Sequence, residues 1–184
     1  MKKILGFDVS STTTAYCLLT VDSGKILSID YGYIKPIKSK NIFERLSSFE
    51  KEINSIITKL NPTEIAIEDI IQFMGRNSSA NTIITLSLFN RTVGLAAYKN
   101  NFNPFLYAVS TIRSKIKINT TPKKEEIPQL LETRFNIIFP YLYSKQTKLK
   151  NGKLKPIKIK QESYDLGDAF AVAFCHAIKT NELK

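Results

Sequence analysis

Acidic residues follow two apolar segments and begin a third, and their placement suggests chemistry. Asp8 ends a run that begins at Lys3, Glu68 ends another, and Asp165 and Asp168 open the apolar stretch near the carboxyl end. A carboxylate at the end of a buried segment is unfavourable unless water, a cation or a hydrogen-bond donor meets it. We therefore predict that these four acids fold together into one metal site.

Oxygen ligands of this kind suit hard divalent cations, because Mg²⁺ binds carboxylates and keeps several waters. Two such ions, about 3.5–4 Å apart, suit phosphodiester hydrolysis: one generates the attacking hydroxide and the other stabilises the leaving oxygen. The four acids thus predict a nuclease centre with two Mg²⁺ ions.

Each acid also has a simpler interpretation. Asp8 could be an ordinary turn or cap residue, and Glu68 a solvated strand end with Asp69 as a bystander. Asp165 and Asp168 lie three residues apart and share a helix face, where they could favour the positive end of their helix. Two acids are more than that task alone needs.

The opening of the chain predicts three adjacent antiparallel strands. They span residues 3–8, 15–21 and 25–34, and the latter two are joined by the turn residues Asp22, Ser23 and Gly24, of which glycine tolerates positive φ. A helix follows, capped by Asn41 with Glu44 three residues on, and Asn61 and Pro62 stop it. These elements precede a fourth strand at 64–68.

The fourth strand positions the acids. A strand, a crossover helix and a further strand predict parallel pairing, so Asp8 and Glu68 should emerge at the same edge of the sheet. We further expect a very apolar helix at 77–98, a strand at 105–109, a helix opened by Pro122 through Phe135, and a last helix from an N-cap at Ser163 to Lys179. The fold class is α/β, in a single domain spanning 1–184.

Composition favours a nucleic-acid partner. The 184 residues carry a net charge of +11, with 43% apolar content that suffices for a core. A lysine-rich segment without acids runs from Lys145 to Lys160, and we expect an exposed loop or hairpin there. It includes the predicted phosphate contacts Lys150, Lys153, Lys155 and Lys158. Genome or growth-temperature bias is the alternative source of these lysines.

Other classes are disfavoured. No apolar run is long enough for a membrane span or a signal peptide, so we expect a cytoplasmic protein with no membrane partner. Cys17 and Cys175 lie in apolar runs without C-x-x-C spacing, which predicts reduced core thiols. With His176 as the single histidine, a Cys/His zinc site is improbable.

At its acids the chain resembles the RuvC family of Holliday-junction resolvases, a branch of the ribonuclease H-like fold. Residues 4–11 are similar to the family's first acidic motif, 65–68 to its second, and 165–173 to its terminal two-acid helix. The resemblance implies a mixed five-stranded sheet, with three antiparallel strands then two parallel, and helices on both faces. It also implies symmetrical cutting of four-way DNA junctions in recombination and repair, Mg²⁺ or Mn²⁺ without another cofactor, and a homodimer.

The same resemblance suggests DNA contacts. Phe73 matches an aromatic residue placed near the junction, although a core aromatic is the simpler interpretation. Lys115 and Lys124 match basic residues flanking the site, and Arg113 or Lys123 could serve instead because the register is loose.

The chain also departs from the family pattern, because Ser10 and Ala15 stand where many members have glycine. This points to a phage-like or divergent branch, and substrate choice could differ. A branched-DNA nuclease without strict four-way preference and an RNA-directed hydrolase therefore stay open, as does a non-catalytic nucleic-acid-binding relative. An actin-like kinase or ATPase is disfavoured, because no glycine-rich phosphate loop is present.

Overall fold

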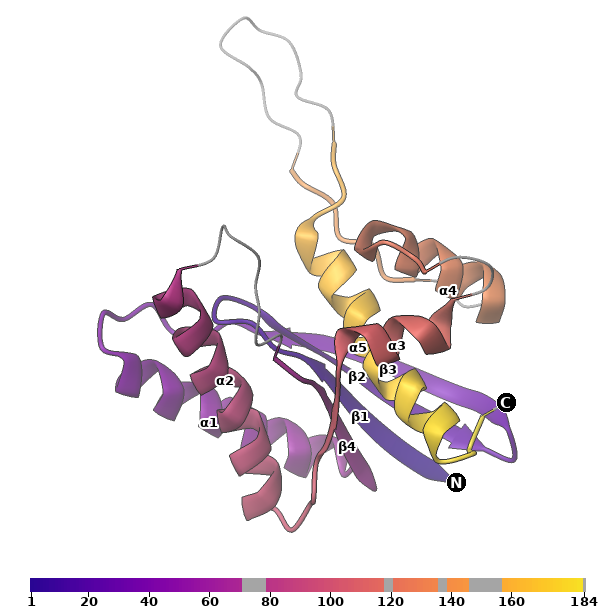
Figure 1. The fold of residues 1–184 in the computed structure, drawn as a ribbon, viewed down its shortest axis with the longest axis horizontal. Coiled ribbons are helices and arrows are strands. Elements are labelled where there is room, and N and C mark those ends of the chain that lie inside the picture. The colour runs from indigo at the N-terminus through magenta and orange to yellow at the C-terminus, as the bar shows by residue number, and fades with distance from the viewer. Residues whose placement is uncertain (71–78, 118–120, 136–138, 146–156, 184) are drawn as a thin grey trace, which may run out of the picture.

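A five-stranded mixed sheet organises the protein. The computed structural model describes residues 1–70, 79–117, 121–135, 139–145 and 157–183. Within these ranges the strand order is β3-β2-β1-β4-β5 (Figure 1). The strands are β1 (Lys2–Asp8), β2 (Thr14–Asp22), β3 (Lys25–Ile34), β4 (Glu64–Glu68) and β5 (Phe105–Tyr107). The first three pair antiparallel, β4 is parallel to β1 and β5 is parallel to β4, which confirms the predicted sheet.

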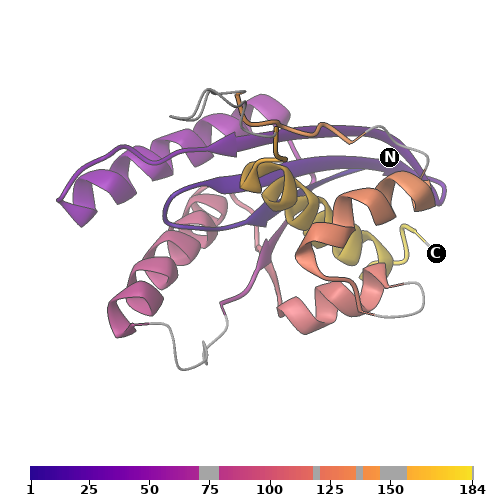
Figure 2. The same ribbon diagram turned by 90° about the horizontal axis from the view of Figure 1, so that it is seen from above.

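Helices cover both faces of the sheet. The helices are α1 (Ile42–Leu60), α2 (Ala80–Lys99), α3 (Val109–Ile116), the 3₁₀ turn η1 (Lys124–Glu126), α4 (Ile127–Phe135) and α5 (Gln161–Lys179). Figures 1 and 2 show α1 and α2 on one face and α3, α4 and α5 on the other. Each face buries its own hydrophobic cluster, with Phe49 and Phe89 on the first and Phe170 and Phe174 on the second. None of the helices described is long and apolar enough to cross a membrane.

Local signals set several boundaries as predicted. Gly24 takes φ 78° in the turn between β2 and β3. Asn41 caps α1 by accepting a hydrogen bond from the Phe43 amide, and Asn61 ends the helix in the left-handed region. Glu44 was expected to accept from the Asn41 amide and complete a capping box, but its carboxylate accepts from the Ser39 hydroxyl, and the Asn41 amide donates to Ser39 Oγ. Cys17 and Cys175 are buried free thiols.

Two predicted boundaries in the middle of the chain are wrong. The fifth strand ends at Tyr107, and residues 109–116 form α3. Only Val109 of this helix was included in the predicted strand; Ile112 and Ile116, four residues apart on α3, are buried in the cluster that surrounds α5. Pro122 does not open a helix: η1 begins at Lys124 and α4 at Ile127.

Ser163 is not the N-cap of the last helix. Helix α5 begins earlier, at Gln161, and the buried Ser163 hydroxyl accepts from the Leu142 amide at 2.8 Å and donates to the Leu142 carbonyl at 3.3 Å. Ser163 therefore ties α5 to the incoming chain.

Gly6 lets α5 lie directly on β1. A Cβ atom at this position would be 2.6 Å from both the Ala169 carbonyl oxygen and the Ala173 amide nitrogen. Contact this close requires glycine on the strand and small residues on the helix. It holds the acidic end of α5 beside the carboxyl end of β1.

Candidate active site

Asp8 and Glu68 occupy neighbouring strand ends. Strands β1 and β4 are in register through Phe7 and Ile67, so each acid follows a paired residue at the same edge of the sheet. Asn90, which is buried on α2, donates from Nδ2 to the Glu68 main-chain oxygen at 2.8 Å and holds this strand end. Sequence reasoning missed Asn90, although an amide inside an apolar helix face was a usable signal.

The α5 acids meet Asp8 at a single cation, the ammonium of Lys124. Lys124 Nζ lies 2.7 Å from Asp168 Oδ2, 2.9 Å from Asp165 Oδ1 and 3.5 Å from Asp8 Oδ2. Three carboxylates from a strand and a helix therefore converge on one point. The structure thus brings together three of the four acids that were predicted to converge.

Arg113 supplies a second cation from α3. Its Nη2 donates to Asp168 Oδ1 at 2.6 Å, and both side chains are nearly buried, at 12% and 5% exposure. The Arg113 Nη1 atom is buried without a hydrogen-bond partner among the described residues. Arg113 thus fixes the Asp168 carboxylate on the side opposite the Lys124 contact.

The four acids and the two cations Lys124 and Arg113 form a cluster with fewer cations than carboxyls. Burial raises the pKa of Glu68 to about 8, and the like charges of Asp8 and Asp168 add to the effect. Burial likewise raises the pKa of Asp8 to about 7 and raises that of Asp168, in both cases against the attraction of Lys124. Burial opposes the charge of Lys124, but the attraction of Asp8 and Asp168 outweighs it and raises the Lys124 pKa. Such carboxyls bind a further cation readily.

The donor set fits a hard divalent ion after one rearrangement. Among the described residues, no three Asp, Glu, His or Cys side chains are grouped closely enough to hold a metal as they stand. The Lys124 ammonium lies where three of the carboxylates converge, and these groups offer only oxygen, as Mg²⁺ prefers. The residues therefore fit such an ion once Lys124 withdraws.

The other residues predicted to contact DNA either form no ion pair with the acids in the described part of the chain or lie outside it. Lys115 and Lys123 make no ion pair with the acids within the described ranges, and Lys123 is exposed. Lys158 is exposed, next to an antiparallel bridge between Tyr143 and Ile159. Phe73, Lys150, Lys153 and Lys155 lie outside the described residues. Asp69 pairs with Arg91 at 3.0 Å, away from the Lys124 contacts.

A mixed sheet with acids at two adjacent strand ends and two more on the last helix defines a nuclease of the ribonuclease H-like class. The family model described as crossover junction endodeoxyribonuclease RuvC matches residues 4–139. The chain therefore belongs to the RuvC family; it is a crossover junction endodeoxyribonuclease, and its hydrolysis depends on metal.

Individual relatives are similar to this chain in sequence, and solved structures are similar to it in fold. The RuvC of Alkaliphilus oremlandii is 26% identical over 95% of this chain and 92% of its own length, and that of Pseudothermotoga lettingae is 24% identical over 97% and 95%. The fold is similar to Thermus thermophilus RuvC in complex with a Holliday junction substrate, at 16% identity and a TM-score of 0.68, covering 98% of this chain and 96% of that one. The yeast mitochondrial Holliday junction resolvase Ydc2 gives a TM-score of 0.67 at 16% identity, covering 98% and 80%.

Proposed function

We propose that Asp8, Glu68, Asp165 and Asp168 hold two Mg²⁺ ions, which Mn²⁺ can replace, and that this centre cuts four-way DNA junctions symmetrically. The observation that carries the proposal is the convergence of three carboxylates on the Lys124 ammonium, with Glu68 at the strand end next to Asp8. When bound, the ions activate water and stabilise the leaving oxygen.

The two basic side chains of the site then have separate tasks. An ammonium and a divalent cation compete for the same carboxylate oxygens, so Lys124 leaves them and becomes available to a phosphate oxygen. Arg113 stays paired with Asp168, because their 2.6 Å contact is almost fully buried and orients the carboxylate. Lys124 thus compensates charge in the free protein and binds phosphate in the complex.

DNA binding relies on charge and shape. Neither the acids nor the lysines read base edges, so the branch itself selects the substrate. The proposed phosphate contacts are the basic side chains around and beyond the site, namely Lys115, Lys123, Lys150, Lys153, Lys155 and Lys158. Phe73, five residues past Glu68, is the proposed side chain that stacks or wedges at the exchange point.

A homodimer would supply two centres for two symmetry-related strands. Apolar side chains on α2 support it, since Ile84, Leu88, Leu95 and Tyr98 are exposed although the helix buries Phe89, Val93 and Ala96 in the core. Light scattering should report about 42 kDa, roughly twice the 20.9 kDa chain. A monomer that persists at micromolar concentration and on DNA would contradict the dimer.

The decisive experiment compares substrates. A synthetic four-way junction, a three-way junction, a flap, a duplex and an RNA–DNA hybrid are incubated with Mg²⁺, Mn²⁺ or EDTA, and cut positions are mapped on each strand. We expect paired symmetrical cuts in the four-way junction and none in EDTA. Near-equal rates on all branched DNAs would favour the general branched-DNA nuclease, and preferred cutting of the hybrid would favour an RNA-directed hydrolase.

A further inference from the structure

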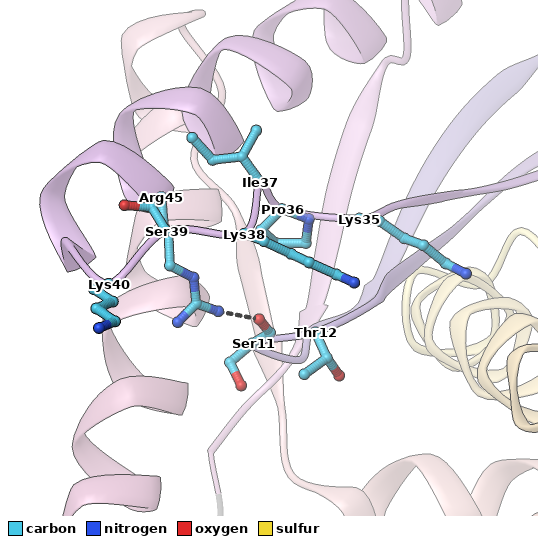
Figure 3. A pocket seen from close by; sticks show the side chains of 9 residues that line it. All are labelled: Ser11, Thr12, Lys35, Pro36, Ile37, Lys38, Ser39, Lys40 and Arg45. Atoms are coloured by element: carbon cyan, nitrogen blue, oxygen red, sulfur yellow. Dashed lines mark hydrogen bonds between the residues drawn. The ribbon is translucent and has the colours of Figure 1, made fainter.

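A basic pocket lies beside the acids, outside the site described above. It has a volume of about 510 Å³ and is formed by the β1–β2 turn, the connector from β3 to α1 and the first turn of α1. Its lining residues are Ser11, Thr12, Lys35, Pro36, Ile37, Lys38, Ser39, Lys40 and Arg45 (Figure 3). The lining includes four cationic side chains and no acidic one.

Most of this positive charge is not neutralised. Lys35 is paired with Glu162 at 3.0 Å. No carboxylate of a described residue lies within ion-pair distance of Lys38, Lys40 or Arg45. A concave surface with uncompensated cations and hydroxyl groups attracts an anion with several oxygens.

The pocket is held in shape by contacts of its own. Arg45 Nη2 donates to the Ser11 carbonyl at 2.6 Å, and the guanidinium lies 5.0 Å from the centre of the Phe89 ring. The Ser10 hydroxyl oxygen accepts from the amides of Thr12 and Thr13 and fixes the turn. Figure 3 shows Arg45 and Lys38 extending toward the turn. The turn and Arg45 are therefore already ordered before an anion binds.

The pocket is close to the reacting centre along two chain segments. Ser11 follows Asp8 by three residues, and Glu162, the partner of Lys35, precedes Asp165 by three. Three residues of chain span at most about 10 Å. One DNA strand advances about 3.4 Å per nucleotide along the duplex axis, so this distance corresponds to roughly three nucleotides.

We propose that this pocket binds a non-scissile phosphate of the strand being cut, within about three nucleotides of the scissile bond. The proposal rests on the proposed function, because it assumes that the acids hydrolyse DNA. Lys38 and Arg45 contact the phosphate oxygens, and the hydroxyls of Ser11 and Thr12 donate to them. Holding this phosphate sets which bond of the strand reaches the acids.

The test pairs a protein change with a DNA change. Single neutral methylphosphonates replace each phosphate within four nucleotides of the mapped cut, and junction affinity is measured for wild type, Lys38→Gln and the control Lys59→Gln. Lys59 is exposed at the far end of α1, so its loss removes the same charge elsewhere. We expect one position to weaken wild-type binding about tenfold and Lys38→Gln much less.

The salt dependence gives a second readout. Lys38→Gln should lower the slope of log affinity against log salt by about 0.9 relative to Lys59→Gln, as for one lost phosphate contact. Arg45→Lys, which keeps the charge but loses the planar fork, should shift the cut position or broaden it. A pocket that binds added inorganic phosphate, without coupling to any methylphosphonate, would overturn the DNA assignment.

Absence of any phosphate effect at Lys38 would also overturn the proposal. These outcomes are separate from the proposed function, which is decided by whether the wild-type protein cuts the unmodified junction. Thermal midpoints equal to that of Lys59→Gln show that Lys38→Gln is folded.

Discussion

Strand β4 and helix α5 carry a polar cluster at each end, and the two clusters are opposite in character. At one end Asp8, Asp165 and Asp168 share the two cations Lys124 and Arg113, and Glu68 lies at the neighbouring strand end. At the other end Glu64 and His176 belong to a group in which every member has a partner. Both clusters take residues from β4 and α5. The difference in character therefore comes from the side chains that surround each cluster.

The cluster at Glu64 is a closed network. His176 is fully buried, with Nε2 2.6 Å from Glu64 Oε2 and Nδ1 2.7 Å from the Tyr107 hydroxyl. Lys2 donates to the other Glu64 oxygen at 2.6 Å, and the Phe105 ring lies 4.4 Å from the imidazole. A neutral imidazole satisfies this arrangement, because Nε2–H donates to Glu64 while Nδ1 accepts from Tyr107.

The pKa values separate the two clusters. Burial tends to raise the pKa of Glu64, but hydrogen bonds from Lys2 and His176 outweigh it and lower the value. In contrast, the pKa of Glu68 rises to about 8. A buried acid whose oxygens all have hydrogen-bond partners stabilises the fold. A group of buried carboxyls with too few cations instead has a high affinity for a further cation. The single histidine, for which the sequence made a Cys/His zinc site improbable, belongs to this hydrogen-bonded network.

The largest expected effect separates the two glutamates of β4. Glu68→Gln should lower junction cleavage by about 10³-fold or more, since several kcal/mol of metal-based transition-state stabilisation is lost. Junction affinity in EDTA at pH 7 should stay similar, because the pKa of Glu68 is raised to about 8 and its carboxyl is already largely neutral in the metal-free protein. Single-turnover cleavage and EDTA-containing binding assays measure the two quantities.

The matched control is Glu64→Gln, the same change four residues away. A Glu68→Gln variant that cuts at near wild-type rate would remove Glu68 from the proposed ligands. Equal losses in both variants would show that the strand, rather than the carboxyl at its end, is what matters.

Lys124→Gln should have the second largest effect. It removes the cation that competes with metal, so half-saturation should need several-fold less Mg²⁺. The maximal rate should still fall about tenfold or more, because a charged contact to phosphate is lost. Lys123→Gln, at the exposed neighbouring residue, is the control. An unchanged Mg²⁺ requirement would mean that Lys124 does not occupy the metal position.

The comparison also shows what sequence could predict. Asp8 and Glu68 could be placed together because a crossover helix between two strands dictates parallel pairing. Asp165 and Asp168 shared a face by helical spacing alone. Local patterns also predicted the three antiparallel strands, whereas the complete five-stranded sheet was implied by the resemblance to the RuvC family.

Sequence could not decide which basic side chains reach the acids. Arg113 and Lys124 reach the acids, but Lys115 and Lys123 were equal candidates in the sequence. Their positions depend on how α3 and η1 pack against α5, and no helix was predicted at residues 109–116, where α3 lies. The partners of Glu64 were hidden for the same reason, since they come from distant parts of the chain.

Glu64→Gln should affect stability rather than cleavage. It weakens contacts to His176 and Lys2 in a partly buried network, which should lower the free energy of unfolding by about 1–3 kcal/mol. The thermal midpoint should fall by roughly 2–10 °C for a chain of this size. Cleavage at 25 °C should stay within about twofold of wild type. A thermal midpoint identical to wild type would mean that the network adds no stability.

The last expected effect is a pH dependence of stability in the metal-free protein. The pKa of Glu68 is about 8 in the folded state, against an ordinary value of 4.5. Between these values the folded protein holds a proton that the unfolded chain has released, so stability falls as pH rises. Glu68→Gln has no such proton, and its stability relative to wild type should increase from pH 5 to pH 8 in EDTA.

Glu64→Gln is the control for the sign. The pKa of Glu64 is lowered, so its stabilising contribution is fully present above 4.5 and is lost only as pH falls through the folded value. The difference in free energy of unfolding between wild type and Glu64→Gln should therefore not increase as pH rises. Chemical denaturation at pH 5, 6, 7 and 8 measures both variants.

Saturating Mg²⁺ should reverse the Glu68 result, because the ion stabilises the ionised carboxylate of the wild type and finds a weaker ligand in the amide. A Glu68→Gln difference that is flat with pH in EDTA would show that Glu68 ionises normally and that the cluster has no excess of negative charge to hold a metal.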